Sequence, residues 1–316
     1  MESFSYWRLN TEQNYQDIID NLLNYEDWLT RQYDTIGNRR ELEFTIEVDR
    51  DEDYVLQIDD EIRVQFAYVF HRWERIVNTE RDNPDDTKRI KQLELDFYVF
   101  EYANQVFFVA LKGQTPHTLT ALRSANNFTG RLEIVENPLS ITDDFFYWLF
   151  NQYMNFEDEE LYTGTNSYVS ALTAYRGGTE NEHDTWGRGN RITRILVTLA
   201  FLFHTDNFKS LTPEFKVDDN TLVVELTTTG NYKVEIARHL GEFFLLEERM
   251  KKGSLLIYFY ITMFPRIYRA YDLHIRDHTW SPQMKLNFLA NIGSEIQDRV
   301  REQQDAIRAQ LEAEEN

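Results

Sequence analysis

The chain has 316 residues, of which 42% are hydrophobic and 15% aromatic, so it can fill sizeable cores and is not a disordered chain. It contains no cysteine, which excludes disulfides, thiolate metal sites, iron–sulfur clusters and cysteine nucleophiles. The net charge of −21 opposes non-specific binding to nucleic acid or anionic membranes, although it does not exclude a local basic site. Because the acidic residues are spread along the chain, this charge indicates solubility rather than mimicry of nucleic acid.

The first half of the chain is predicted to alternate between helices and strands. Residues 12–33 carry a helical apolar stripe, and residues 41–48 alternate between apolar and polar side chains as a half-buried strand does. Residues 61–77 fit both a helix and a strand, and their length favours a helix. The other expected elements are a strand at 54–58 that pairs with 41–48, a hairpin of 93–100 with 106–111, a helix opened by Thr115-Pro116, and a strand at 131–135.

A new pattern begins after Asn137-Pro138, which we take as a domain boundary. The apolar run Leu255–Phe264 is too short to cross a bilayer, since a spanning helix needs about 20 residues, and predicts a buried strand or core helix. The other elements expected here are a helix capped by Thr142, a polar glycine-rich stretch at 156–190, a helix at 191–204, a meander of 215–217, 222–226 and 232–236, a helix at 237–252, and one long helix at 283–316.

These elements predict an α+β fold with antiparallel sheet segments, packed helices and a long C-terminal helix. We expect an N-terminal α+β domain at 1–137, a second α+β domain with a small meander at 138–282, and the C-terminal helix at 283–316. The stripe of that helix has two explanations: packing on its own chain, or an intermolecular coiled coil.

The sequence contains none of the common phosphate-loop, nucleophile-elbow or zinc-protease motifs. Glu214-Phe215-Lys216, with Asp206 upstream, has the residue types of a metal-dependent nuclease, but the short spacing and Pro213 favour an edge strand.

Asp272, His274 and His278 have a metal-ligand spacing if they lie on a helix. No third ligand follows at a suitable distance, so surface histidines are the better interpretation. We therefore expect no bound metal and no cofactor.

Residues 176–194 reverse the charge of the chain locally. Arginines beside a capped helix start, with glycines that let the backbone come close, could bind an anion, and a tryptophan could stack on a base. The alternative is a mobile surface loop followed by a capped helix. The candidate anion-binding or nucleic-acid-binding residues are Arg176, Trp186, Arg188, Asn190, Arg191 and Arg194.

The run ITDDFFYWLF at 141–150, followed by a capped apolar helix, resembles accessory proteins of bacterial antiviral defence clusters. This resemblance implies a role beside nucleic acid or a partner protein, and it assigns no residue a role. The N-terminus does not resemble a signal peptide, and with the absence of cysteine this indicates a cytoplasmic protein.

We therefore expect a non-enzymatic interaction or accessory subunit that binds another protein, or itself, through the C-terminal helix, and no membrane. The alternative is a nucleic-acid-binding or nucleic-acid-processing protein that uses residues 176–194.

Overall fold

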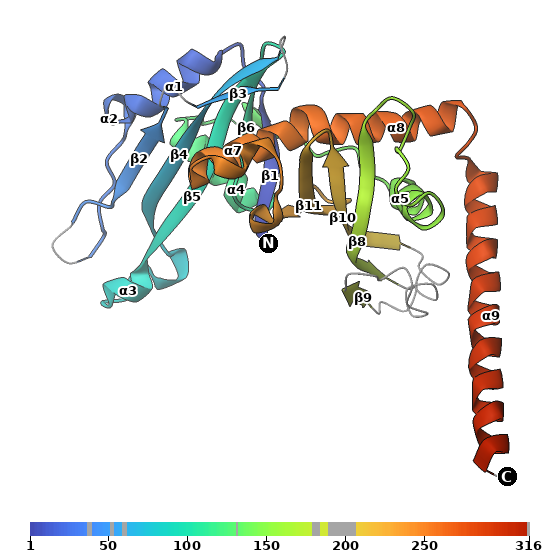
Figure 1. Ribbon diagram of the computed structural model, residues 1–316. Helices are drawn as coiled ribbons and strands as arrows, with labels where there is room; N and C mark the ends of the chain where they lie inside the picture. The colour runs from blue at the N-terminus through green and yellow to red at the C-terminus, as the bar shows by residue number, and fades with distance from the viewer. Residues whose placement is uncertain are drawn as a thin grey trace. The chain divides into compact units, whose positions relative to one another are not determined.

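The computed structural model describes residues 1–36, 40–50, 54–58, 62–130, 132–178, 184–188 and 207–314 (Figure 1). Antiparallel strands, packed helices and a long C-terminal helix confirm the α+β class. The chain forms two compact units. Unit 1 comprises Met1–Leu139, Thr229–Tyr232 and Phe243–Phe259, and unit 2 comprises Ser140–Thr228, Lys233–Glu242 and Tyr260–Asn316. The three-part domain division stays a prediction.

Unit 1 is built on an antiparallel sheet in the order β2-β4-β5-β6-β1, in which β3 also pairs with β4 and β7 with β1. Its strands are β1 (Glu2–Leu9), β2 (Phe44–Asp49), β3 (Val55–Gln57), β4 (Arg63–Ile76), β5 (Ile90–Tyr102), β6 (Gln105–Ala110) and β7 (Ile134–Glu136). Ala103 and Asn104 have φ values of 52° and 59°, as a tight turn between twisted strands requires, and this turn completes the predicted β5–β6 hairpin.

Helices cover both faces of this sheet. Unit 1 contains α1 (Tyr15–Leu23), α2 (Tyr25–Trp28), α3 (Asp86–Arg89), α4 (Pro116–Ala125) and α7 (Glu248–Tyr258). The apolar stripes of α1 and α4 join one core with Val69, Phe97 and Phe108 of the sheet. On the opposite face α7 lies close to Phe66 and Tyr98. The helix predicted after Thr115 is confirmed, with the Thr115 hydroxyl accepting a hydrogen bond from Thr118 N.

The prediction of a helix at 61–77 was wrong, because these residues form the 14-residue strand β4. Four consecutive residues, Phe66 to Val69, are buried, since helices cover both faces at this point. A strand buried on both faces loses the apolar–polar alternation that identifies strands, and its length resembles that of a helix. The expected partner of residues 54–58 was also wrong, because β3 pairs with β4 and not with β2.

Two other predictions in unit 1 hold in part. The helix expected at 12–33 ends at Trp28, after a break at Asn24. The helix expected at 237–252 begins only at Glu248, after two short 3-10 turns.

Unit 2 contains strands in the order β11-β10-β8-β9, and Lys233 and Val234 of β12 pair with β11. Its elements are α5 (Asp143–Asn155), β8 (Ser167–Gly178), β9 (Asp184–Arg188), β10 (Asn207–Val217), β11 (Asn220–Thr227), α8 (Phe264–Arg276) and α9 (Pro282–Glu314), and β12 spans Tyr232–Val234. Aromatic rings join α5 to the sheet at Phe208 and to α8 at Phe264 and Tyr271. The predicted meander, the helix after Thr142 and the long C-terminal helix are confirmed.

In unit 2, two strands were not predicted, and one prediction was wrong. The polar stretch at 156–190 contains the strands β8 and β9, and the pairing of β8 with β10 has three register shifts, which interrupt the period-two pattern. β10 is not an edge strand, because it pairs with both β8 and β11. Pro213 fits inside it because a register shift lies beside it. The helix predicted at 191–204 lies outside the described residues.

A single aspartate fixes the start of α9 on unit 2. Asp144 of α5 accepts hydrogen bonds from the Tyr271 hydroxyl and Trp280 Nε1, both at 2.8 Å, and its other oxygen lies 3.4 Å from Lys285 Nζ. Phe288 and Ile292 are buried beside this contact, whereas residues 301–311 are all exposed. Within the described residues, no helix is long and apolar enough to cross a membrane.

The packing of α7 in unit 1 provides a test of the fold. A Cβ at Gly253 would lie 2.6 Å from Phe66 Cε2 and 2.7 Å from Tyr98 Cε1, and both rings are fully buried. Gly253→Ala should therefore lower the free energy of unfolding by about 1–3 kcal/mol, although alanine is the better helix former by about 1 kcal/mol. Urea denaturation measures this change. Glu248→Ala on the exposed first turn is the control, and equal stability of the wild type and Gly253→Ala would refute the packing.

Candidate functional site

The predicted arginine segment is described only in part. Arg176 lies exposed on β8, and the backbone register places it directly opposite Trp186 of β9, while Arg188 lies opposite Ala174. The remaining candidates, Asn190, Arg191 and Arg194, lie outside the described residues. The segment is thus a β-hairpin at its start, and a phosphate-binding role for it stays a prediction.

The other two sequence candidates have structural partners. His274 Nε2 lies 2.6 Å from Leu161 O and Nδ1 lies 2.9 Å from Thr279 Oγ1, so both ring nitrogens are engaged. Glu214 pairs with Arg238 at 2.6 Å, and Asp206 is not described. In the described part of the chain, no group of three or more His, Asp or Glu side chains could hold a metal ion.

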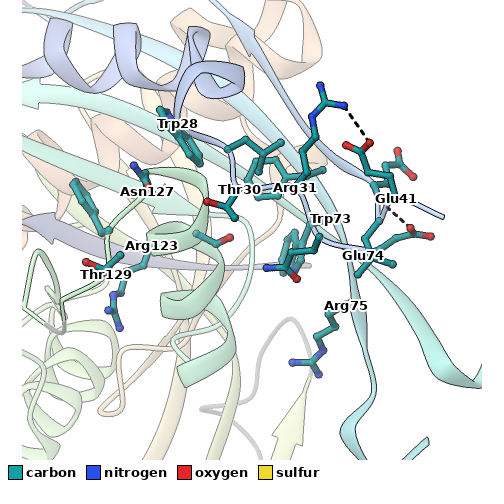
Figure 2. A pocket seen from close by; sticks show the side chains of 17 residues that line it. Trp28, Thr30, Arg31, Glu41, Trp73, Glu74, Arg75, Arg123, Asn127 and Thr129 are labelled. Carbon is teal, nitrogen blue, oxygen red and sulfur yellow. Dashed lines mark hydrogen bonds and ion pairs between the residues drawn. The ribbon is translucent and has the colours of Figure 1, made fainter. Parts of the chain in front are cut away.

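The structure places a hollow of about 340 Å³ in unit 1 that the sequence did not reveal (Figure 2). Its walls come from α2 and the segment after it, the start of β2, the end of β4, and the end of α4. Aromatic side chains line it from four segments: Trp28 of α2, Phe44 of β2, Trp73 of β4, and Phe128 after α4. Asn127, with φ of 57°, and a hydrogen bond from Phe128 N to Arg123 O turn the chain after α4 towards the hollow. The hollow is therefore built by segments that are far apart in sequence.

A continuous series of rings forms the aromatic side of the hollow. Trp28 meets Phe44 edge to face at 5.9 Å between centroids, and Phe44 lies 4.7 Å from His71. His71 in turn stacks on Trp73 at 4.5 Å, with an angle of 10° between the ring planes. Because His71 covers one face of the Trp73 indole, the other face is directed away from it, and Arg75 follows two residues later on the same side of β4.

His71 is fully buried within this series. Its Nδ1 lies 3.2 Å from Thr45 O, and its buried Nε2 has no hydrogen-bond partner among the described residues. Burial disfavours the charged ring and lowers the pKa of His71 to about 4. The imidazole is therefore neutral at pH 7 and acts as a flat packing group that holds Trp73.

The charged side chains of the hollow differ in their pairing. Its glutamates are all in ion pairs: Glu41 with Arg31 at 3.1 Å, Glu74 with Arg40 at 2.7 Å, and Glu43 with Arg72 at 3.7 Å. No carboxylate pairs with Arg75 or Arg123 among the residues that the structure describes, and the buried Nε of Arg123 has no hydrogen-bond partner there. The hollow thus has two cationic groups whose charge no side chain in the described ranges neutralises.

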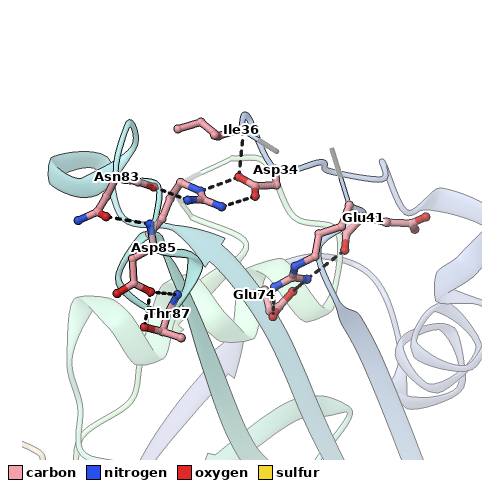
Figure 3. A network of polar contacts seen from close by, with 9 residues as sticks. Asp34, Ile36, Glu41, Glu74, Asn83, Asp85 and Thr87 are labelled. Atoms are coloured by element: carbon pink, nitrogen blue, oxygen red, sulfur yellow. Dashed lines mark hydrogen bonds and ion pairs between the residues drawn. The ribbon is translucent and has the colours of Figure 1, made fainter. Parts of the chain in front are cut away.

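A buried ion pair braces the segment that forms one wall of the hollow (Figure 3). Arg89 donates from Nε and Nη2 to the two oxygens of Asp34, at 2.9 and 2.6 Å, and its Nη1 donates to Asn83 O. Arg40 bonds Glu74 in the same two-pronged way, at 2.7 and 2.9 Å. The hydrogen bonds from the Arg89 guanidinium lower the pKa of Asp34 to about 2. The wall is therefore fixed to β4 and to α3 by two-pronged arginine geometry that lysine could not reproduce.

The sequence contained weak signals of this hollow. His71, Trp73 and Arg75 have the spacing of one strand face, but the helix predicted for 61–77 scatters them around its circumference. Arg123 and Trp28 lie on separate helices, so nothing local connects them. A strand prediction for β4 would have revealed three of the chemically informative side chains, and only tertiary packing adds the others.

The buried state of His71 predicts a specific pH dependence of stability. Between pH 6.5 and about 4 the unfolded chain binds a proton at His71 that the folded chain does not, so the free energy of unfolding should fall as the pH falls. The contribution is at most ~3 kcal/mol over this window. His71→Phe keeps a stacked ring and should flatten the slope, which thermal or urea denaturation across this pH range would measure.

Asp34 provides the control, because its window is different. The folded pKa of Asp34 is depressed, so its stabilising contribution is present above pH 4 and is lost between about pH 4 and 2. Asp34→Asn should therefore lower stability at neutral pH and change the slope only below pH 4. A His71→Phe protein with the wild-type slope between pH 6.5 and 4 would contradict the assignment.

Comparisons with family models and with curated proteins found no relative of this chain. No family model matches the sequence, and no curated protein matches it.

Proposed function

We propose that this protein is a non-enzymatic interaction subunit that binds another macromolecule through the distal half of α9. The supporting observation is that residues 301–311 are all exposed and still carry apolar side chains. Val300, Ile307 and Leu311 are 42%, 47% and 57% exposed. The resemblance of residues 141–150 to accessory proteins of antiviral defence clusters agrees with such a role, and an accessory subunit is expected to act by contact rather than by catalysis.

The distal half of α9 has the residue pattern of a coiled-coil seam. Ile296, Val300, Gln303, Ile307 and Gln310 follow one another at steps of four, three, four and three residues. This spacing keeps them on one side of a supercoiled helix. Val300 and Ile307 then occupy a positions, where β-branched residues favour two-stranded pairing.

The charges of this helix support the same seam. Glu295, Asp298, Arg301, Glu302, Asp305, Arg308 and Glu312 all fall at b, c or f positions. Arg299, at a g position, is held by Glu295 of its own helix at 2.6 Å. The positions beside the seam between 303 and 311 are Gln304, Ala306 and Leu311, so no like charges would meet across it. This arrangement matters in a chain of net charge −21, where association otherwise brings acidic surfaces together.

We expect the partner to be the same helix of a second copy of this chain. Gln303 and Gln310 lie at d positions, and an amide both donates and accepts hydrogen bonds, so each can pair with its own copy. Polar seam residues set the register of a coiled coil at a cost in stability. The pair should therefore be weak and depend on protein concentration.

Mutation at one seam position tests the proposal. Ile307→Glu places two like charges across a paired seam and should abolish association, so that the protein keeps the mass of one chain, 37.9 kDa, at all concentrations. The wild type should approach twice that mass as its concentration rises. Sedimentation velocity or light scattering over a hundredfold concentration range measures the difference.

Ala309→Glu is the matched control, because it adds the same charge at an exposed c position of the same helix. It should associate like the wild type. Truncation after Val300 should also give a single chain with an unchanged melting temperature, since Phe288 and Ile292 remain. A wild type that keeps the mass of one chain up to millimolar concentration would refute self-pairing, and unfolding of the truncated protein would refute an external role for the distal half.

A second candidate function is nucleic-acid binding at the β8–β9 hairpin, favoured by the register that sets Arg176 opposite Trp186. Arginine and tryptophan are residue types that bind the phosphates of a single strand and stack on its bases. Arg188→Ala combined with Arg191→Ala should then abolish binding of a single-stranded oligonucleotide and leave the melting temperature nearly unchanged. Wild-type affinity should fall steeply with salt, which filter binding would detect. Equal binding by both proteins would exclude this function.

A further inference from the structure

We propose that the aromatic hollow of unit 1 binds a ligand that carries both a planar base and a phosphate, such as a nucleotide or a nucleotide within a single strand. This site is independent of the α9 seam, because every residue that lines it belongs to unit 1. Its volume of about 340 Å³ is at the lower end of the range for small-molecule sites.

The aromatic side of the hollow suits a base. His71 fixes one face of the Trp73 indole, and Trp28 Nε1 donates to Asn21 O at 2.9 Å, so the ring of Trp28 is also held in place. Tryptophans that are already fixed lose little conformational freedom when a ring stacks on them. A π-face accepts any base, whereas an aliphatic ligand would gain nothing from its planarity.

The cationic side suits a phosphate. Arg75 follows Trp73 on the same face of β4, and Arg123 lies across the hollow on α4. Guanidinium groups bind phosphate oxygens in a two-pronged way. Since neither has a carboxylate partner in the described ranges, an anion binds without first breaking an ion pair. The lining of the hollow therefore combines a fixed ring with cations.

A second cavity extends the site. It has a volume of about 500 Å³ and shares Trp73 and Arg75 with the hollow. Lys91 lines it, and the strand register places Lys91 directly opposite Arg75. Two like charges facing each other across a strand pair are unfavourable unless an anion lies between them. Phosphate groups on either side of Trp73 would satisfy this requirement, and a short single strand would supply them.

Isothermal titration with four probes tests the proposal: adenosine monophosphate, adenosine, inorganic phosphate and a four-nucleotide single strand of DNA. We expect saturable binding of the monophosphate, weaker binding of adenosine and of phosphate alone, and tighter binding of the tetranucleotide if the second cavity takes part. A monophosphate that binds as tightly as the tetranucleotide would assign the site to free nucleotides. No saturable binding of either phosphorylated probe at millimolar concentration, or equal affinity for inorganic phosphate and the monophosphate, would overturn the proposal.

Arginine variants locate the binding to this hollow. Arg75→Ala and Arg123→Lys should each weaken binding about tenfold, because each removes a charge-assisted contact or its two-pronged geometry. Arg276→Ala is the matched control, since it removes the same charge but Arg276 lies on α8, outside the hollow, where it is paired with Asp272. Its affinity should stay within about twofold of the wild type. Equal losses in all three variants would show a general charge effect and overturn the site, and circular dichroism melting checks that each variant is folded.

Discussion

Unit 1 depends on the pairing of the 14-residue strand β4. This strand hydrogen-bonds to β2, β3 and β5, so it fixes the register of three neighbouring strands. Since successive side chains point to opposite faces, the same register sends Phe66 towards α7 and sets His71, Trp73 and Arg75 in line on the face that α1 and α4 cover. If the register slipped by one residue, Phe66 would move to the face of His71, Trp73 and Arg75, and these three would move to the face of Phe66. Because side chains are buried on both faces of the strand, such a slip is unfavourable, and the arrangement of the hollow is maintained.

Local signals in the sequence were sufficient for most elements. Thr115 and Thr142 cap helices as predicted, and the β5–β6 hairpin follows from its alternation and turn residues. The failures have tertiary causes: β4 is covered on both faces, so its pattern loses the period of two, and β8 has register shifts that interrupt its pattern. The candidate site was missed for the same reason, because Trp28, Trp73 and Arg123 meet only after the sheet and two helices have packed.

The two halves of α9 obey different constraints. Its first turns are held by Asp144, whose oxygens serve Tyr271, Trp280 and Lys285 together. Because one carboxylate of α5 accepts from these three donors, it also fixes the first turn of α9 against α5. Beyond residue 300 no side chain in the described part of the helix is buried, yet Val300, Gln303, Ile307 and Gln310 leave one side of the helix without charge. A helix under no contact constraint would have no reason to exclude charge from one side over several turns, and this selectivity is the physical basis of the proposed seam.

Charge pairing connects the two proposals. In a chain with 54 acidic and 33 basic residues, a cation usually finds a carboxylate nearby, as Arg31, Arg40 and Arg72 do around the hollow. Several cations in the described residues have no such partner, and three of these, Arg75, Lys91 and Arg123, line the two cavities that share the Trp73 indole, which stacks on a neutral histidine. Cations that share a cavity with a fixed indole can bind the charged part of a ligand while the ring stacks on its planar part, and this combination is the physical basis of the proposed nucleotide site.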